Sequence, residues 1–174
     1  MKKIFLVGYL MAAINLHAQE FKISSPDFAS NGTIPTQFTC QGANKPPKLS
    51  WSGAPTTTKS FVLICDDPDA PSATPWVHWV VYNIPATKTS LDQVSGRSEQ
   101  FADGTRQGSN SFPKRGYDGP CPPVGHGVHH YHFKLYALDT VLTLKSTVTK
   151  DTVVNAMQGH ILAQTEVVGT YERK

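Results

Sequence analysis

Short apolar stretches recur along the chain, separated by turns that draw on 13 prolines and 13 glycines. The stretches are rich in Val, Ile, Tyr, Phe and Trp, as β-strands are. They predict strands over residues 21–24, 48–51, 61–65, 77–84, 131–139 and 167–171. Alternation predicts that certain side chains share one face of a strand: His78, Val80, Tyr82 and Ile84 in one segment, and Tyr131, Phe133, Leu135 and Ala137 in another.

One segment near the C-terminus has the period of a helix instead. Val153, Met157 and Ile161 recur at four-residue spacing, and Thr149 is a suitable N-cap before them. Residues 90–120 are polar and rich in glycine, which predicts a long surface connection. The whole pattern predicts a mostly β fold, chiefly antiparallel, with one C-terminal helix in a single domain.

The first 18 residues have the features of a secretory signal peptide. Lys2 and Lys3 precede an apolar run over residues 4–14, and Ala18 is a small residue suited to the cleavage site. The run is shorter than the roughly 20 residues that span a bilayer, and no second run follows. We expect a soluble domain over residues 19–174, without stable membrane insertion, in the periplasm or secreted. The alternative for residues 1–18 is an N-terminal strand or a retained anchor.

Charge argues against nucleic acid as a partner. Residues 1–18 contain two lysines and no acids, so their removal lowers Lys plus Arg from 16 to 14 against 13 acids, a net charge of +1. Basic residues do not cluster along the remaining chain. Proteins that bind nucleic acid need such clusters to neutralise phosphates, so no nucleic-acid partner is predicted.

Three cysteines in an exported protein predict one disulfide and one free thiol. Cys65 ends an apolar run and is interpreted as a buried thiol. Cys40 and Cys121 lie in loops rich in glycine and proline and form the better pair. Three free thiols remain the alternative.

Carboxylates and prolines crowd the end of one predicted strand and the start of the next: Asp66, Asp67, Pro68, Asp69, Pro71, Trp76 and His78. Prolines fix the backbone, so these acids are held rigidly. For Asp66 alone, a solvated turn carboxylate is the plainer interpretation, because charged side chains are seldom buried without a partner. The sharp reversal of the chain predicts cis peptide bonds before Pro71 and Pro75.

A second run leads from a proline-rich turn through glycines to histidines that open a strand: Gly119, Pro120, Cys121, Pro122, Pro123, Gly125, His126, Gly127, His129, His130, Tyr131 and His132. Glycine-rich turns can expose backbone N–H groups that accept anions. His129 and Tyr131 share one face of the strand, so we expect them to address one ligand. His130 and His132 point to the opposite face.

Other chemistry has weaker support. His130 and His132 have the His-x-His spacing of some zinc sites, with His126 as a third candidate, but the ligand set is incomplete. No metal or other cofactor is therefore predicted. The sequence also lacks a Gly-x-Ser-x-Gly turn, a cysteine-protease signature, a phosphate loop and a dinucleotide fingerprint. We predict no enzymatic activity and no catalytic residue.

The two runs resemble the motifs of the phosphatidylethanolamine-binding protein family, and in particular its bacterial Raf-kinase-inhibitor-like members. The matching residues are Asp67-Pro68-Asp69-Ala70-Pro71, Trp76, His78, Gly119-Pro120-Cys121-Pro122-Pro123, Gly125, His129 and Tyr131. The resemblance covers residues 21–174, and two compound motifs in the right order make it specific. One departure is His130, where the family usually has arginine.

The resemblance implies a Greek-key antiparallel β-sandwich with a small pocket at one end, which in the family accepts phosphate, phosphorylated head groups or similar anions. The implied ligand-binding residues are Asp67, Asp69, Trp76, His78, Cys121, Pro122, Pro123, His129 and Tyr131. We expect the acids to accept hydrogen bonds from His78 and His129 and to favour protonated imidazoles. Because the set contains no Arg or Lys, a simple anion should bind weakly.

The resulting hypothesis is an exported binding or regulatory protein for a phosphate-containing small molecule or lipid head group. The alternative is a protease or kinase inhibitor that docks on a protein partner, as relatives in the family do. Kinase inhibition fits an exported protein least well. A phosphoester-acting enzyme that uses an Asp–His pair is the third hypothesis. The sequence leaves a homodimer open.

Overall fold

The computed structural model describes residues 19–174 except residues 93–95 and residue 146, so the predicted signal peptide lies outside the described residues. The elements in chain order are β1 (Lys22–Ser24), β2 (Gly32–Thr33), the 3-10 helix η1 (Thr36–Phe38), β3 (Leu49–Ser52), β4 (Ser60–Asp67), β5 (Trp76–Pro85), β6 (Ser90–Leu91), β7 (Arg106–Gln107), β8 (His129–Leu138), α1 (Lys150–Met157) and β9 (Ile161–Tyr171). Within these ranges no helix is long and apolar enough to cross a membrane.

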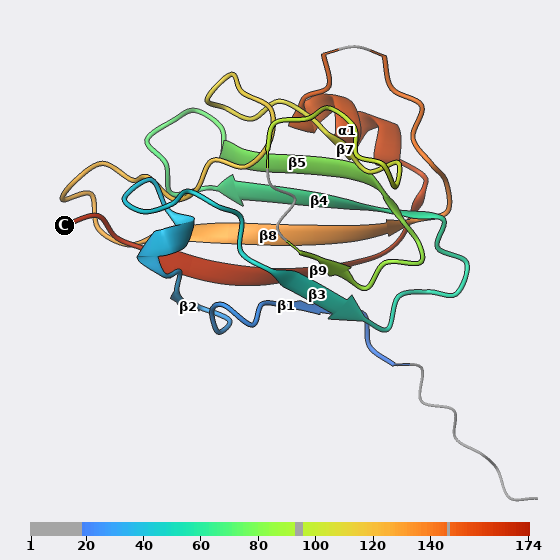
Figure 1. The fold of residues 1–174 in the computed structure, drawn as a ribbon, viewed down its shortest axis with the longest axis horizontal. Helices are drawn as coiled ribbons and strands as arrows, with labels where there is room; N and C mark the ends of the chain where they lie inside the picture. The colour runs from blue at the N-terminus through green and yellow to red at the C-terminus, as the bar shows by residue number, and fades with distance from the viewer. Residues whose placement is uncertain (1–18, 93–95, 146) are drawn as a thin grey trace, which may run out of the picture.

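Two sheets form the body of the molecule (Figure 1). The small sheet has the order β1-β3-β6, and the large sheet has the order β2-β9-β8-β4-β5-β7. The large sheet is antiparallel except for the short parallel pairing of β2 with β9. β8 returns beside β4 although β5 precedes it, which is a crossover of the Greek-key type. The predicted mostly β sandwich with one helix is confirmed, although β9 follows the helix.

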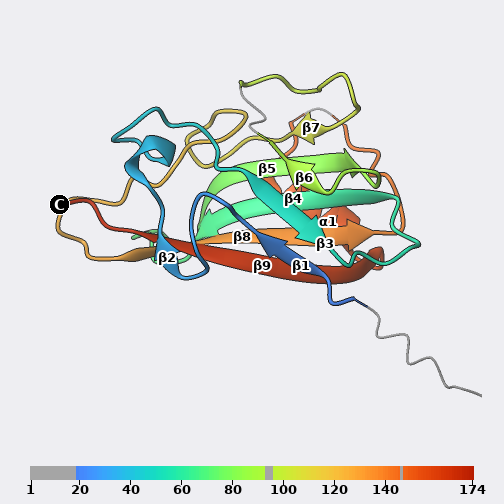
Figure 2. The ribbon, with the colours of Figure 1, turned by 60° about the horizontal axis from the view of Figure 1, so that its bottom comes forward.

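Buried hydrophobic side chains between the two sheets form one core. A second cluster of hydrophobic side chains lies on the other face of the large sheet, where α1 covers it (Figure 2). β4 is buried along its whole length because both of its faces are covered. The side chains of β8 that face the core between the sheets are the ones that alternation predicts: Tyr131, Phe133, Leu135 and Ala137.

β5 departs from the predicted alternation at its C-terminal part. Val80 and Tyr82 face α1, whereas Ile84 lies in the core between the sheets. The register with β4 shifts between Phe61 and Leu63, which adds one residue to β5. A β-bulge changes the face on which later residues lie, so the prediction that these side chains share a face is wrong for Ile84.

A second register shift of β5 lies opposite the end of β4, between Cys65 and Asp66. His78 lies at this irregularity, and its ring packs edge-on against Tyr131 at a centroid distance of 5.1 Å. Tyr131 belongs to the core between the sheets, so the bulge turns His78 away from the α1 face that Val80 occupies, and the prediction of a shared face is wrong for His78 too. Bulges re-aim side chains in this way beside functional sites.

The helix begins as predicted and ends earlier. The Thr149 hydroxyl accepts the Thr152 N–H and caps the first turn. The helix stops at Met157, and Gly159 has a φ of 80°, a left-handed conformation that favours glycine. The chain reverses there, so Ile161 opens β9 instead of continuing the helix as predicted.

The peptide bonds before Pro71 and Pro75 are not cis; the chain contains no cis bond wherever the structure describes it. That prediction is wrong. The reversal after β4 uses side-chain bonding instead: Asp67 Oδ1 accepts the backbone N–H of Asp69 at 2.8 Å. Such bonding of an aspartate to its own backbone makes a turn without a cis bond.

Candidate functional site

A cavity of about 200 Å³ opens at one end of the sandwich. At this end β4 stops and β5 and β8 begin (Figure 1). The residues that line it are Asp67, Ala70, Pro71, Ser72, Trp76, His78, Phe112, Cys121, Pro122, Pro123, His129 and Tyr131. Every residue of the predicted set except Asp69 is therefore brought together. Two motifs far apart in sequence meet because β4 pairs with both β5 and β8.

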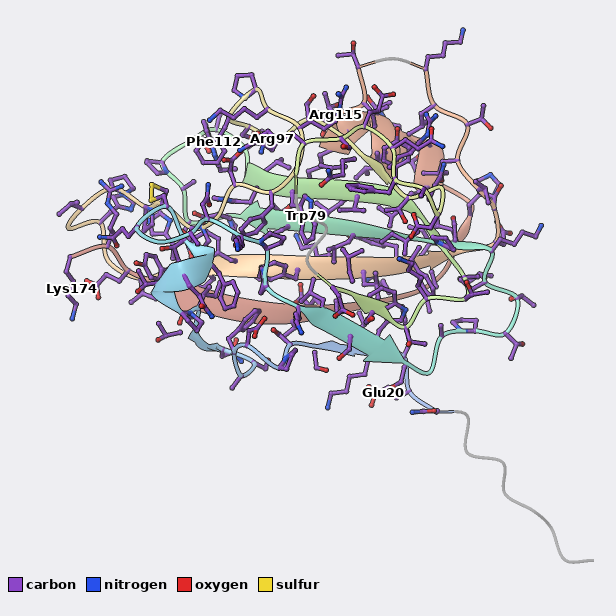
Figure 3. All side chains as sticks on the ribbon, viewed as in Figure 1. Glu20, Trp79, Arg97, Phe112, Arg115 and Lys174 are labelled. Atoms are coloured by element: carbon purple, nitrogen blue, oxygen red, sulfur yellow. A yellow bond between two sulfur atoms is a disulfide. The ribbon has the colours of Figure 1, made fainter. Side chains whose placement is uncertain are left out.

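Phe112 is the lining residue that sequence reasoning missed most clearly. It comes from the long polar connection, and Figure 3 shows it beside the start of β5. Its ring packs edge-on against Trp76 at 5.4 Å and against His78 at 5.6 Å between centroids. An aromatic residue within a polar segment was the available signal, because such a side chain needs an apolar surface to cover. Ala70, Pro71 and Ser72 were also missed.

His78 is buried and bonds to the backbone rather than to an acid. Its Nδ1 donates a hydrogen bond of 2.6 Å to the carbonyl oxygen of Asp118. Burial lowers the pKa of His78, and this effect outweighs the opposing influence of the Asp118 carbonyl and the Asp67 charge. The neutral ring then carries its proton on Nδ1 and a lone pair on Nε2. The expected hydrogen bond from His78 to a carboxylate is not found among the described residues, and the lowered pKa disfavours the protonated ring that was expected.

Asp118 is itself held by a network around its side chain. Arg97 makes two hydrogen bonds to its carboxylate, of 2.9 and 3.0 Å, and Asn110 donates a third of 2.7 Å. Burial acts to raise the pKa of Asp118, but the hydrogen bonds from Arg97 and Asn110 lower it. The network fixes the carbonyl that selects the tautomer of His78 (Figure 3 shows Arg97).

A chain of three side chains runs from the pocket to the surface. The Asp67 carboxylate accepts a hydrogen bond of 2.7 Å from His129 Nδ1, as expected. His129 Nε2 lies 2.7 Å from Nδ1 of His126, an exposed residue of the loop that precedes β8. Both nitrogens of His129 are therefore engaged, and its ring serves to orient its neighbours rather than to offer a free donor.

Tyr131 is fully buried, and its hydroxyl has no hydrogen-bond partner among the described residues. Burial raises the pKa of Tyr131 well above its usual value, and the Asp67 charge adds to the rise. The hydroxyl therefore stays protonated. A buried donor without a partner is costly unless a bound molecule or water accepts its proton.

Asp69 lies outside the cavity, contrary to expectation. It accepts hydrogen bonds from the backbone N–H and from Nδ1 of His130, at 2.8 and 2.7 Å, and both side chains are exposed. Burial acts to raise the pKa of Asp69, but the bonds from His130 lower it. The next outward histidine, His132, lies 3.2 Å from Glu166. No group of three or more metal-binding side chains gathers within the described ranges.

The predicted disulfide is present and forms part of the pocket wall. Cys40 and Cys121 are bonded, with their Cα atoms 5.4 Å apart, and Cys65 is a buried free thiol. Burial raises the pKa of Cys65, with a further contribution from Asp66. The alternative of three free thiols is wrong. The disulfide links the part of the pocket wall formed by Cys121, Pro122 and Pro123 to the loop after η1.

Asp66 is fully buried and faces away from the cavity. Its carboxylate accepts hydrogen bonds from Lys134 at 2.8 Å and from Lys150 at 2.5 Å. Burial acts to raise the pKa of Asp66, but the bonds from the two lysines lower it. The interpretation of Asp66 as a solvated turn residue is wrong, because its carboxylate is buried and paired with the ammonium groups of Lys134 and Lys150.

Comparison with known proteins identifies the family of the chain. The family model described as phosphatidylethanolamine-binding protein matches residues 24–172. A UPF0098 protein of Methanothermobacter thermautotrophicus is 49% identical over 84% of this chain and 95% of its own. The UPF0098 protein YbcL of Escherichia coli is 37% identical over 99% of this chain and 100% of its own.

Solved structures show the same relationship. The crystal structure of Escherichia coli YbcL superposes with a TM-score of 0.82 at 37% identity, over 90% of this chain and 100% of that one. The homologue CT736 of Chlamydia trachomatis has a TM-score of 0.79 at 38% identity, over 88% of this chain and 98% of that one. The chain belongs to the phosphatidylethanolamine-binding protein family.

Proposed function

We propose that the cavity binds a small phosphate-type anion, either free or as the phosphorylated head group of a larger molecule. The observation that carries this proposal is the Tyr131 hydroxyl, a buried donor in the wall of the cavity that has no hydrogen-bond partner in the part of the chain that the structure describes. A phosphoryl oxygen would accept a hydrogen bond from the Tyr131 hydroxyl and remove the cost of burying that hydroxyl without a partner. The apolar walls of Trp76 and Phe112 keep competing water away from this bond.

The charge of the cavity wall determines which protonation state of a phosphate group binds more tightly. Among the residues that the structure describes, Asp67 is the carboxylate that lines the cavity, and none of the lining residues is Arg or Lys. A phosphate dianion would meet repulsion from Asp67, whereas the monoanion carries its own proton, which His78 Nε2 can accept. The second ionisation of a phosphate monoester lies near pH 6, so affinity should rise as the pH falls through that value.

Calorimetric titration tests the proposal with inorganic phosphate, phosphoethanolamine and ethanolamine at pH 5.5 and pH 8. The two phosphate compounds should bind, more tightly at pH 5.5, and Tyr131→Phe should weaken both by about tenfold, the value of roughly one hydrogen bond. His160→Gln is the matched control, because that histidine is exposed and pairs with Asp139. Equal affinity of wild type and Tyr131→Phe for both compounds would refute the proposal.

We also infer that the protein is exported. The support is the sequence of residues 1–18 together with the Cys40–Cys121 disulfide, a bond typical of oxidising compartments. N-terminal sequencing of protein from the native host should begin at or near Gln19. An intact Met1 in a cytoplasmic fraction would contradict export.

A further inference from the structure

The two sulfurs of the Cys40–Cys121 disulfide differ in their surroundings. Cys40 is exposed at the surface, whereas Cys121 is half-buried and lines the pocket. Figure 3 shows the disulfide at the end of the molecule where Lys174 lies. Thiol–disulfide exchange requires a thiolate to reach one sulfur, so access favours attack at Cys40.

The positively charged guanidinium of Arg173 lies closer to one of the two sulfurs than to the other. Its Nη1 lies 3.1 Å from Cys121 Sγ and 3.8 Å from Cys40 Sγ. A guanidinium beside a sulfur stabilises the thiolate that forms when the bond breaks. The backbone carbonyl of Arg173 accepts the Gly125 N–H at 3.3 Å, which ties the arginine to the loop that follows Cys121. Position and charge both assign Cys121 as the leaving sulfur.

We propose that this disulfide is a thiol–disulfide exchange site that reacts with small thiols and dithiols in the folded protein. A thiolate attacks Cys40 Sγ, a new sulfur–sulfur bond forms there, and the Cys40–Cys121 bond breaks with its electron pair on Cys121 Sγ. With a dithiol, the second thiol then displaces Cys40. Two electrons pass from the dithiol to the protein, which leaves two cysteine thiols and an oxidised dithiol.

Exchange also alters the pocket, because Cys121 and the two prolines after it form one wall. Breaking the bond removes the covalent tie to Cys40 and leaves the hydrogen bond from Cys40 N–H to the Pro120 carbonyl, of 3.1 Å. Ligand affinity should fall on reduction. This consequence rests on the proposed function, whereas the exchange is measured without ligand, so the two proposals can fail separately.

The reaction is tested on the folded, oxidised protein. Glutathione is added, the mixture is quenched with iodoacetamide, and the modified cysteines are mapped by mass spectrometry. The adduct should lie on Cys40, with Cys121 alkylated. Cys65 is an internal control, because its buried thiol reacts only if the protein unfolds. An adduct on Cys121, or alkylation of Cys65 in step with the other two, would overturn the proposal.

Rates with dithiothreitol test the role of Arg173. Loss of the guanidinium raises the pKa of the leaving Cys121 thiol, and a thiol of higher pKa leaves more slowly, so Arg173→Gln should slow reduction by about threefold or more. Arg115→Gln is the matched control, because that arginine pairs with Glu99 elsewhere on the surface (Figure 3). Equal rates for wild type and Arg173→Gln would show that the guanidinium does not assist the step.

Discussion

His78 Nδ1 and the backbone carbonyl of Asp118 are joined by a hydrogen bond of 2.6 Å inside the protein. A carbonyl oxygen can only accept, so the proton must sit on Nδ1 and the lone pair on Nε2. The bond joins β5 to the connection before β8. The tautomer of a pocket histidine is thus set by the main chain and not by an acidic side chain.

Stability should depend on pH through His78. Burial lowers the pKa of His78 in the folded protein, so the unfolded chain takes up a proton that the folded chain does not. The free energy of unfolding should therefore fall as the pH drops below about 6.5, by up to about 1.4 kcal/mol per pH unit. Urea denaturation between pH 7.5 and pH 5 should show a smaller slope for His78→Gln. Parallel slopes for the two proteins would contradict this assignment.

Tyr131→Phe should change stability and binding in opposite directions. Removing a buried hydroxyl that has no partner should stabilise the unliganded protein by about 1 kcal/mol. The same variant should bind phosphate less tightly. Chemical denaturation without ligand measures the first effect and calorimetry the second. A structural hydroxyl would instead give a loss of stability with unchanged affinity.

Asp69→Asn should leave phosphate affinity within about twofold of wild type and cost at most about 1 kcal/mol, as exposed ion pairs do. The reason is the pairing of Asp69 with His130 outside the cavity. Calorimetry and urea denaturation check both values. A loss as large as that of Tyr131→Phe would mean that Asp69 contributes to the pocket after all.

Asp66→Asn should destabilise the protein by about 3 kcal/mol, because Lys134 and Lys150 lose their buried counter-charge. The pKa of Asp66 is lowered in the folded state, so its stabilising effect is present above about pH 4 and is lost as the pH falls further. Urea denaturation at pH 7 measures the loss. Asp151→Asn in the first turn of α1 is the control and should cost much less.

Much of the fold could be predicted because its pattern is local. Alternation in β8 identified the side chains of the core, and the Thr149 cap located the start of α1. The face of Ile84 could not be predicted, since a single extra residue in β5 has no clear composition signal. The predicted helix extends too far because the four-residue spacing continues to Ile161, whereas Gly159 adopts a left-handed conformation beyond the end of α1.

The candidate site was predictable as a set of residues but not as a set of bonds. Most of the predicted lining does converge, yet the partner of His78 is a backbone carbonyl, which every residue carries and no sequence pattern marks. The family resemblance places Asp69 in the pocket, whereas the structure places it outside the cavity. Its partner is His130, the position where the family resemblance leads us to expect arginine.

Asp66 and Asp67 are consecutive residues at the end of β4, and their carboxylates serve opposite sides of one sheet. Asp66 binds Lys150 at the start of α1, while Asp67 binds His129 in the pocket. A single peptide bond therefore joins a residue that contacts α1 to a residue that lines the cavity. We therefore expect a displacement of the start of α1 to act on the Asp67–His129 pair through the backbone of β4 rather than through the core.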